Sequence, residues 1–200
     1  MAGGQDAGAE IRRAPALRLV VDEPALVGRI AAGEQRAFDE LYRLYLPRLR
    51  RFLGAMLSSP PLVEEVLDDT MLVVWTRSGS FDGASKVSTW VFSIAYRTAL
   101  NALRRRREPH TDEGGEERPS PDKTPEEELA GTHARRAIIR AMERLSPDHR
   151  AVVDLTYFHE LGYREIAEIV GCPVETVKTR MHYARRYMRR ALSGRLADWL

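Results

Sequence analysis

Apolar residues recur at steps of three and four along two stretches in the N-terminal part of the chain, which is the spacing of one helix face. The first stretch carries Phe38, Leu41, Tyr42, Tyr45, Leu49, Phe52, Leu53 and Met56, and the second, after a proline-containing break, carries Val63, Val66, Leu67, Thr70 and Val74. Pro47 lies inside the first stretch and predicts a kink or a restart, because proline cannot donate the helical hydrogen bond. The pattern predicts two amphipathic helices.

A third helix is predicted from about Lys86 to Arg106, after a loop over residues 80–85, and its side chains form two faces. One face is apolar or small and comprises Val91, Ala95, Thr98 and Ala102. The other comprises Trp90, Ile94, Arg97, Asn101 and Arg104. Because an aromatic ring can stack on an unpaired base while arginine binds phosphate and asparagine reads base edges, this second face suits a nucleic-acid strand. Equally, Trp90 and Ile94 could be core residues beside a solvated, arginine-rich helix end.

The C-terminal part of the chain predicts a helix-turn-helix. An apolar stripe is formed by Ala134, Ala137, Ile138, Ala141, Met142 and Leu145. It ends at Ser146, which can cap a second helix, with Pro147 in its first turn, that runs to about Phe158. A short helix with Ile166, Ala167 and Val170 follows, ended by a glycine, and a longer helix starts near Pro173. In this layout the longer helix can lie in the DNA major groove.

The longer helix separates core-facing positions from a polar, basic surface. Its core-facing positions are Val174, Val177, Met181, Ala184 and Met188, and its opposite face is centred on Glu175, Thr176, Thr179, Tyr183 and Arg186. Residues 174–192 hold six basic side chains and one acidic side chain, which favours a polyanion and predicts steep salt dependence of binding. The other interpretation is a corner of a helical bundle with a basic surface.

The net charge of +2 over 200 residues hides an uneven distribution. Residues 34–107 carry a net +4 and residues 134–192 a net +5, whereas residues 108–133 carry a net −7 with four prolines and three glycines. Such an acidic, proline-rich segment is typical of a flexible linker. We therefore expect an all-α chain of two small helical domains, 34–107 and 134–192, joined by the linker 108–133 and flanked by a partly disordered extension over 1–33 and a tail over 193–200. The extension has apolar runs over residues 17–21 and 26–30 and could add a short helix.

The sequence contains few features of an enzyme. The single cysteine, Cys172, excludes an internal disulfide framework and is expected to be a small buried residue. The five histidines form no closely spaced ligand motif; His149 and His159 could meet Asp154, but solvated or capping roles are favoured. We expect no catalytic residues, no metal, no cofactor and no small-molecule substrate. Without a long apolar run or a signal peptide, the chain is expected to be soluble and cytoplasmic.

Several motifs in these helices resemble those of the extracytoplasmic-function (ECF) sigma factors of bacterial RNA polymerase. The segments 163–168 and 176–181 look like the signature of the family's fourth conserved region, and 145–147 with 150–153 match its entry helices. The segment 88–95 is similar to the threonine-tryptophan motif of the second region, and 103–106 resembles the basic end of the same helix. The resemblance covers roughly residues 35–107 and 134–192.

The resemblance implies three sets of contacts. The second-region domain would bind the polymerase clamp through Glu64, Glu65, Asp68, Asp69, Met71 and Trp75. It would capture the opened minus-10 strand through Phe81, Lys86, Ser88, Thr89, Trp90, Arg97, Asn101 and Arg104. The fourth-region domain would rest on the polymerase flap and read minus-35 duplex DNA through Glu175, Thr176, Lys178, Thr179, Arg180, Tyr183 and Arg186. An anti-sigma factor is a further implied partner.

Two positions depart from the family pattern, and two other functions stay open. Asp68 stands where the family commonly has glutamine, and Arg97 where it commonly has asparagine, which affects clamp contact and minus-10 preference. From the residues alone, four carboxylates on one helix could also be a solvated surface. The main rival function is a stand-alone helix-turn-helix regulator that binds duplex DNA without polymerase. The other rival is a nuclease or deaminase that acts on DNA, but the chain contains no closely spaced metal-ligand motif that would support it.

Overall fold

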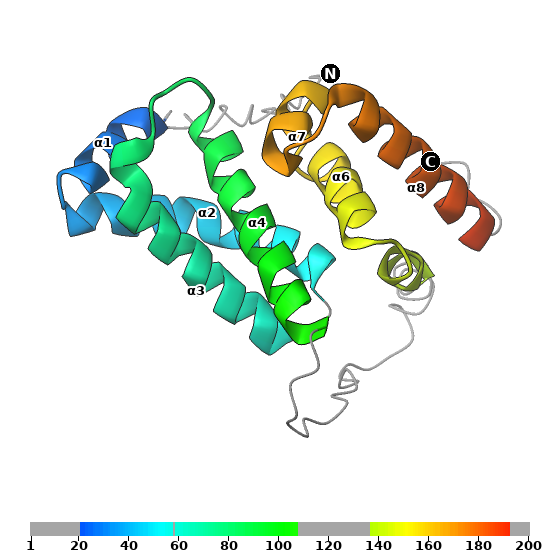
Figure 1. Cartoon of the computed structure of the whole chain (residues 1–200). Helices are drawn as coiled ribbons and strands as arrows, with labels where there is room; N and C mark the ends of the chain where they lie inside the picture. The colour runs from blue at the N-terminus through cyan, green and yellow to red at the C-terminus, as the bar shows by residue number, and fades with distance from the viewer. Residues whose placement is uncertain (1–20, 58, 108–136, 193–200) are drawn as a thin grey trace, which may run out of the picture.

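The computed structural model describes residues 21–57, 59–107 and 137–192, and all regular structure in these ranges is helical (Figure 1). The predicted all-α fold is therefore confirmed. The predicted linker, the tail and most of the N-terminal extension lie outside the described residues. An N-terminal bundle comprises α1 (Glu23–Ala31), α2 (Gln35–Met56), α3 (Pro60–Arg77), a 3₁₀ turn (Ser78–Ser80) and α4 (Val87–Arg107). A C-terminal unit comprises a helix over residues 137–143, α6 (Pro147–Tyr157), α7 (Tyr163–Val170) and α8 (Val174–Ala191).

The N-terminal bundle is held together by the apolar stripes of its helices. Helix α2 does not restart at Pro47 but continues through it, and the adjacent Tyr45 and Leu49 are fully buried. Packing of this buried stripe outweighs the local cost of the proline, since helical stability in proteins comes mainly from tertiary contacts. Helix α1, in the region where a short helix was considered possible, packs against α2. Its Leu26, Val27 and Ile30 are buried there.

The C-terminal unit has the predicted helix-turn-helix. The Ser146 side chain accepts a hydrogen bond from the backbone of His149, so it caps α6 as expected. Gly171 ends α7 with a φ of +66°, a left-handed conformation that glycine adopts without steric cost. Four residues of α8 are buried against α6 and α7, namely Val177, Met181, Ala184 and Met188.

The two units pack directly against each other in this structure. Helix α4 of the bundle lies along α7, and α2 lies against α6 (Figure 1). Helix α4 is therefore enclosed by its own bundle on one side and by the C-terminal unit on the other. The sequence pattern indicated two faces for α4, but the structure shows a third, on which Phe92 and Tyr96 are buried.

Candidate nucleic-acid interface

The side chains predicted to bind a single strand lie along α4 and the loop before it. Arg97, Asn101 and Arg104 are exposed, as a phosphate- and base-contacting surface requires. Trp90 is half-buried, with its ring centroid 5.4 Å from that of Phe81 in the preceding loop. The structure thus brings the two predicted aromatic residues together at one end of this face. Ser88 is half-buried, while Thr89 is only 3% exposed and lies inside the fold in this conformation.

Lys86, at the start of this predicted strand-binding surface, is paired with the C-terminal unit. Its Nζ donates to Oε1 of Glu165 in α7 at 2.6 Å. The hydrogen bond raises the pKa of Lys86 and lowers that of Glu165, because each group stabilises the charged form of the other. Sequence reasoning missed Glu165 as a partner, since nothing local relates two residues so far apart in the chain.

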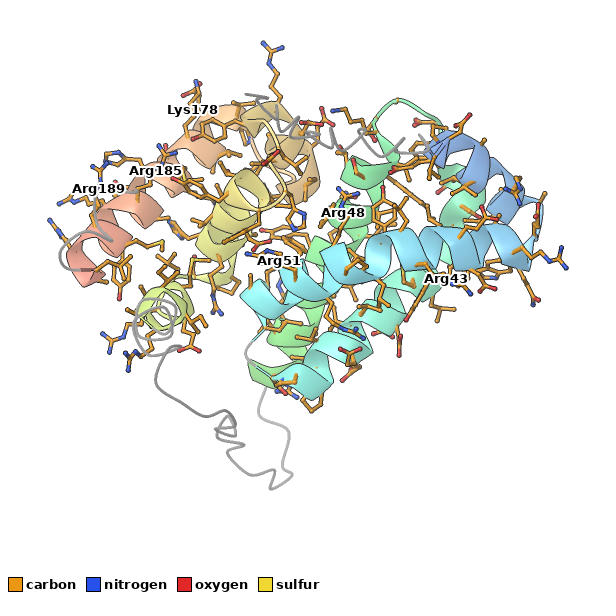
Figure 2. All side chains as sticks on the ribbon, turned by 180° about the vertical axis from the view of Figure 1, so that it is seen from behind. Arg43, Arg48, Arg51, Lys178, Arg185 and Arg189 are labelled. Carbon is orange, nitrogen blue, oxygen red and sulfur yellow. The ribbon has the colours of Figure 1, made fainter. Side chains whose placement is uncertain are left out.

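The outer face of α8 carries the residues predicted to read duplex DNA. The exposed residues on this helix include Glu175, Lys178, Thr179, Tyr183 and Arg186, and Thr176 is half-buried. Figure 2 shows Lys178, Arg185 and Arg189 spaced along α8, so that positive charge follows the helix axis. Lys178 donates to Glu175 at 2.7 Å one turn earlier, and Thr179 donates to the backbone carbonyl of the same glutamate. The surface is basic and polar, which suits a DNA groove.

Arg180 differs from its neighbours on α8 because it points to α6. Its Nη2 donates to Oδ2 of Asp148 at 2.7 Å, and its side chain is 21% exposed. The Tyr96 hydroxyl of α4 donates to the other oxygen of Asp148, also at 2.7 Å. Burial, followed by this hydrogen bond, raises the pKa of Tyr96 above its ordinary value. Cys172 is half-buried rather than buried as expected, with its sulfur 3.8 Å from Nη1 of Arg180.

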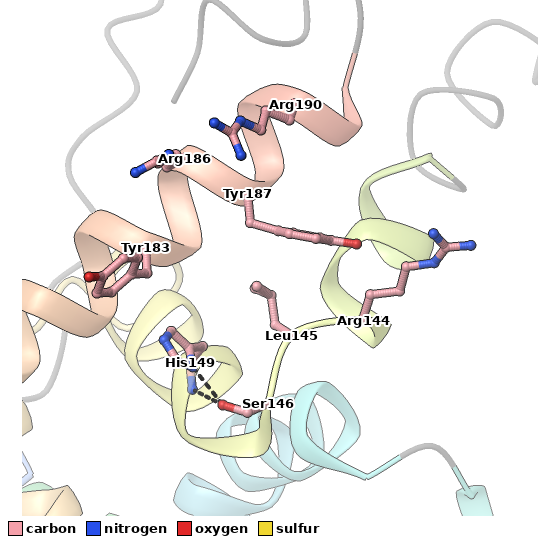
Figure 3. A pocket seen from close by; sticks show the side chains of 8 residues that line it. All are labelled: Arg144, Leu145, Ser146, His149, Tyr183, Arg186, Tyr187 and Arg190. Atoms are coloured by element: carbon pink, nitrogen blue, oxygen red, sulfur yellow. Dashed lines mark hydrogen bonds between the residues drawn. The ribbon is translucent and has the colours of Figure 1, made fainter.

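An open groove of about 540 Å³ runs beside α8 on the C-terminal unit. Figure 3 shows its lining: Arg144, Leu145, Ser146, His149, Tyr183, Arg186, Tyr187 and Arg190. Two of these residues, Tyr183 and Arg186, also belong to the predicted duplex-reading face. The groove combines an aromatic and apolar lining with arginine side chains from α8 and with Arg144, which follows the helix over residues 137–143. Such a lining suits an amphipathic partner helix with acidic edges.

The four carboxylates of α3 have three different environments. Glu64 forms a two-pronged ion pair with Arg50 of α2, which lowers the pKa of its carboxyl. Glu65 and Asp69 lie 4.0 and 3.9 Å from Arg105 of α4. Asp68 instead borders a second open groove, of about 480 Å³, between α2 and α3. The residues lining that groove are Gln35, Phe38, Asp39, Asp68, Met71, Leu72 and Trp75.

Leu72 is a candidate contact residue of the α2–α3 groove that the sequence prediction did not include. Its side chain is 60% exposed, whereas the predicted Met71 is only 3% exposed and supplies part of the groove floor. The signal was present, since Leu72 follows Asp68 by four residues and therefore lies on the acidic face of the helix rather than in its apolar stripe. Phe38 lies beside Trp75 at this groove, with ring centroids 5.2 Å apart.

His159 is not solvated, and it does not act as a cap, in contrast to the expectation from the sequence. Its side chain is 4% exposed, and Nε2 lies 3.2 Å from Oδ2 of the buried Asp154. The ring sits against Phe92 and Phe52 of the N-terminal bundle. Within residues 21–57, 59–107 and 137–192, no cluster of three or more histidine, cysteine, aspartate or glutamate side chains is arranged to hold a metal ion. The helices in these ranges are also too short or too polar to cross a membrane.

Comparison with known proteins matches each helical unit to a different conserved region of the sigma-70 proteins. The family described as Sigma-70 region 2 matches residues 41–108, and the family described as Sigma-70, region 4 matches residues 135–188. The ECF RNA polymerase sigma factor RpoE of Cereibacter sphaeroides is 31% identical over 164 residues, covering 80% of this chain and 88% of that protein. The ECF RNA polymerase sigma-E factor of Haemophilus influenzae is 30% identical over 173 residues, covering 82% and 91% of the two chains.

Two solved structures show the same fold at lower sequence identity. CnrH, in complex with the cytosolic domain of CnrY, superposes with a TM-score of 0.63 at 22% identity, covering 84% of this chain and 95% of that chain. The sigma factor RpoE of Bartonella quintana, in complex with the anti-sigma factor NepR, gives a TM-score of 0.60 at 24% identity, covering 77% and 95%. The helical architecture is therefore shared beyond the reach of close sequence similarity.

Proposed function

This chain belongs to the ECF sigma factors of RNA polymerase, and we propose that its two helical units divide promoter recognition between them. As a sigma factor it binds core polymerase and promoter DNA and acts in promoter recognition and transcription initiation. The observation that supports the division of labour is the placement of two different nucleic-acid surfaces on separate units. One surface combines aromatic rings with arginines on α4, and the other is the basic outer face of α8.

The α4 surface is suited to the opened minus-10 strand. The Phe81 and Trp90 rings can stack on unpaired bases, while the exposed Arg97 and Arg104 can contact phosphates along the same strand. Asn101 lies between the two arginines along α4 and can donate to and accept from a base edge. Duplex DNA would bury its base faces within the stack, so the aromatic rings favour a single strand.

The α8 surface is suited to the minus-35 duplex. A recognition helix contacts base edges with its N-terminal residues, and in α8 these are Glu175, Thr176 and Thr179. Glutamate can accept from the exocyclic amine of cytosine, and threonine can contact several bases. Lys178 and Arg186 supply charge for flanking phosphates.

The grooves of the two units are suited to polymerase. We assign the clamp contact to the α2–α3 groove, where exposed Leu72 and half-buried Trp75 offer apolar surface beside Asp68. We assign the flap contact to the groove beside α8, where Leu145 and Tyr187 lie among arginines. An anti-sigma factor, the kind of partner found in the Bartonella quintana complex, is expected to compete for these surfaces. Each assignment describes binding, and the protein is proposed to act without catalytic residues of its own.

Reconstitution with bacterial core polymerase tests this function. The purified chain is mixed with core enzyme, and promoters are selected from a random DNA library by transcription. We expect a two-element promoter, with strand opening at the downstream element only when both core and this chain are present. Protection of duplex DNA by the chain alone, unchanged by polymerase and without transcription, would instead support the stand-alone regulator.

A further inference from the structure

Arg180 points toward the inside of the C-terminal unit, although the residues one turn before and after it belong to the predicted duplex-reading face of α8. It follows Thr176 by four residues and precedes Tyr183 by three, so these side chains lie along one side of the helix. Thr176 is half-buried and Tyr183 is 55% exposed, whereas the Arg180 side chain is 21% exposed. Its guanidinium is therefore engaged mainly with groups of the protein.

Two contacts join Arg180 to the segments that frame α8. Its Nη2 donates to Oδ2 of Asp148, in the first turn of α6, at 2.7 Å. Its Nη1 lies 3.8 Å from the sulfur of Cys172, in the turn between α7 and α8. A charge-assisted hydrogen bond is short and directional, so it defines an orientation as well as a contact. One side chain thus connects α8 both to α6 and to the turn that precedes α8.

Asp148 is a fixed point on α6. It follows Pro147 in the first turn of this helix, and the Ser146 side chain caps the same turn. A carboxylate in the first turn is also favoured by the partial positive charge at the N-terminus of the helix. The other carboxylate oxygen of Asp148 accepts from the Tyr96 hydroxyl, which leaves Oδ2 for Arg180. The position of the acceptor is therefore set by α6 rather than by α8.

The remaining contacts of α8 specify its rotation less strongly. Methionine adapts to irregular spaces and apolar contacts are not directional, and the buried stripe consists of Val177, Met181, Ala184 and Met188. The N-cap residue, Pro173, forms no side-chain capping hydrogen bond. On the other side of the stripe, Arg185 donates to the neutral hydroxyl of Tyr157 at 3.0 Å, in an exposed contact where water can compete. The more enclosed, charged contact is the one between Arg180 and Asp148.

The following inference rests on the sigma-factor function above. We propose that Arg180 is a positioning residue for minus-35 recognition, and that its ion pair with Asp148 sets the rotation of α8 on α6. The ion pair thereby places the base-reading side chains at the N-terminal end of α8, which are Glu175, Thr176 and Thr179. The resemblance to the family placed Arg180 itself among the duplex-reading residues, whereas in this role Arg180 controls where its neighbours meet the bases.

A small rotation of α8 is enough to disturb base reading. A helix with its side chains has a radius of about 5–6 Å, so a rotation of about 10° displaces the ends of the side chains by about 1 Å. Hydrogen bonds to base edges require donor–acceptor distances of about 2.7–3.2 Å, so this displacement breaks or weakens them. Contacts of long side chains with phosphates tolerate it better, because a flexible stem can readjust. Loss of the ion pair should therefore reduce discrimination between bases more than it reduces total affinity.

Base reading and positioning by Arg180 predict different effects of Asp148→Asn. This substitution weakens the hold on the guanidinium, which lies one turn from Tyr183 on the duplex-reading face. An arginine that reads a base would then bind DNA as selectively as before or more so. A recognition helix that has lost its rotational restraint would bind DNA less selectively, although no side chain of its outer face has changed.

Competition between two promoter templates tests the proposal. Holoenzyme is assembled from core polymerase and the full chain, and it transcribes a selected promoter and a variant with one substituted minus-35 base pair in the same reaction. We expect the wild type to favour the matched template by about tenfold or more. Asp148→Asn and Arg180→Gln should each lower this ratio by about fivefold or more, the discrimination lost with one base contact. Both templates compete for one holoenzyme, so the ratio does not depend on polymerase affinity.

The double variant and a charge control sharpen this test. Asp148→Asn combined with Arg180→Gln should lower the ratio no further than either single substitution, because both act through one contact. Glu168→Gln removes the same charge as Asp148→Asn from an exposed site on α7 and should keep the wild-type ratio. Circular dichroism and thermal unfolding establish that each variant is folded. Effects of the two single substitutions that multiply in the double variant would overturn the proposal.

Salt dependence separates positioning from phosphate binding. Arg186→Gln removes a proposed phosphate contact and should reduce the slope of log affinity against log salt by about 0.9, whereas Arg180→Gln should leave the slope unchanged. An equal reduction by Arg180→Gln would overturn the proposal, as would a wild-type template ratio in folded Asp148→Asn. Lack of minus-35 discrimination by the wild-type holoenzyme would instead contradict the proposed function itself, and the positioning role with it.

Discussion

Truncation of Leu72 to alanine should weaken binding of core polymerase without destabilising the factor. Leu72 is 60% exposed in the α2–α3 groove, so alanine removes little buried surface from the free protein. Full burial of a leucine side chain contributes about 1.5–3 kcal/mol. The exposed part of Leu72 therefore corresponds to about 1–2 kcal/mol if polymerase covers it completely. This free energy corresponds to a dissociation constant about 5- to 30-fold higher.

The assay is equilibrium binding of the full chain to immobilised core polymerase. Val21→Ala is the matched control, because Val21 is another exposed apolar residue of the N-terminal part of the chain, 46% exposed, that does not line the groove. Thermal unfolding should stay near the wild-type value for both variants, since surface substitutions usually change stability by less than about 0.5 kcal/mol. Equal polymerase affinity of Leu72→Ala, Val21→Ala and the wild type would refute the assignment of this groove to the clamp.

Three further predictions concern single residues of the two units. Trp90→Ala should weaken binding of the opened strand by about tenfold or more while Trp90→Phe retains most of it, since stacking contributes about 1–3 kcal/mol per base; fluorescence anisotropy with a single-stranded minus-10 oligonucleotide measures this. Gly171→Ala should lower the free energy of unfolding by about 1–2 kcal/mol, because its φ of +66° strains any side chain although the surrounding space is open; chemical denaturation measures this. Burial, and then the charge of Arg180, lower the pKa of His149 below the ordinary 6.5. The contribution of the neutral His149 to the free energy of unfolding is therefore fully present above pH 6.5 and is lost as the pH drops through the lowered pKa. Thermal melting measured against pH should show a smaller loss of stability at acidic pH in His149→Gln than in the wild type.

The helix-turn-helix was predictable from the sequence because its determinants are local. Ser146 caps the helix that begins one residue later, and Gly171 ends the helix immediately before it. The apolar steps of α8 place its buried residues correctly, because packing against α6 and α7 requires a stripe with the helical repeat. The exception is Val174, which is half-buried at the first turn of the helix, where fewer neighbours are available to cover it.

The contact between the two units was not predictable from the same patterns. Tyr96 and Asp148 are 52 positions apart, and Lys86 and Glu165 are 79 positions apart, so no periodic signal connects them. The two faces predicted for α4 did not include Phe92, which is fully buried in the structure. The pattern could not identify the surface that covers Phe92. His159, which follows α6, and Asp154, within α6, are polar residues of a kind that is usually exposed, and only the structure shows that both side chains are buried.

The charge distribution of the C-terminal unit explains how two units of net positive charge can pack together. Residues 34–107 carry +4 and residues 134–192 carry +5, so their total charges repel. The acidic residues at the interface all belong to the C-terminal unit, namely Asp148, Asp154 and Glu165, and they meet Tyr96, Arg51 and Lys86 of the bundle. The basic residues on the outer side of α8 face away from this contact (Figure 2). One unit therefore has an acidic docking face and a basic DNA face, and phosphates are repelled from the first and attracted to the second. Contact between the units therefore leaves the basic outer face of α8 exposed, and its positive charge can still attract duplex DNA.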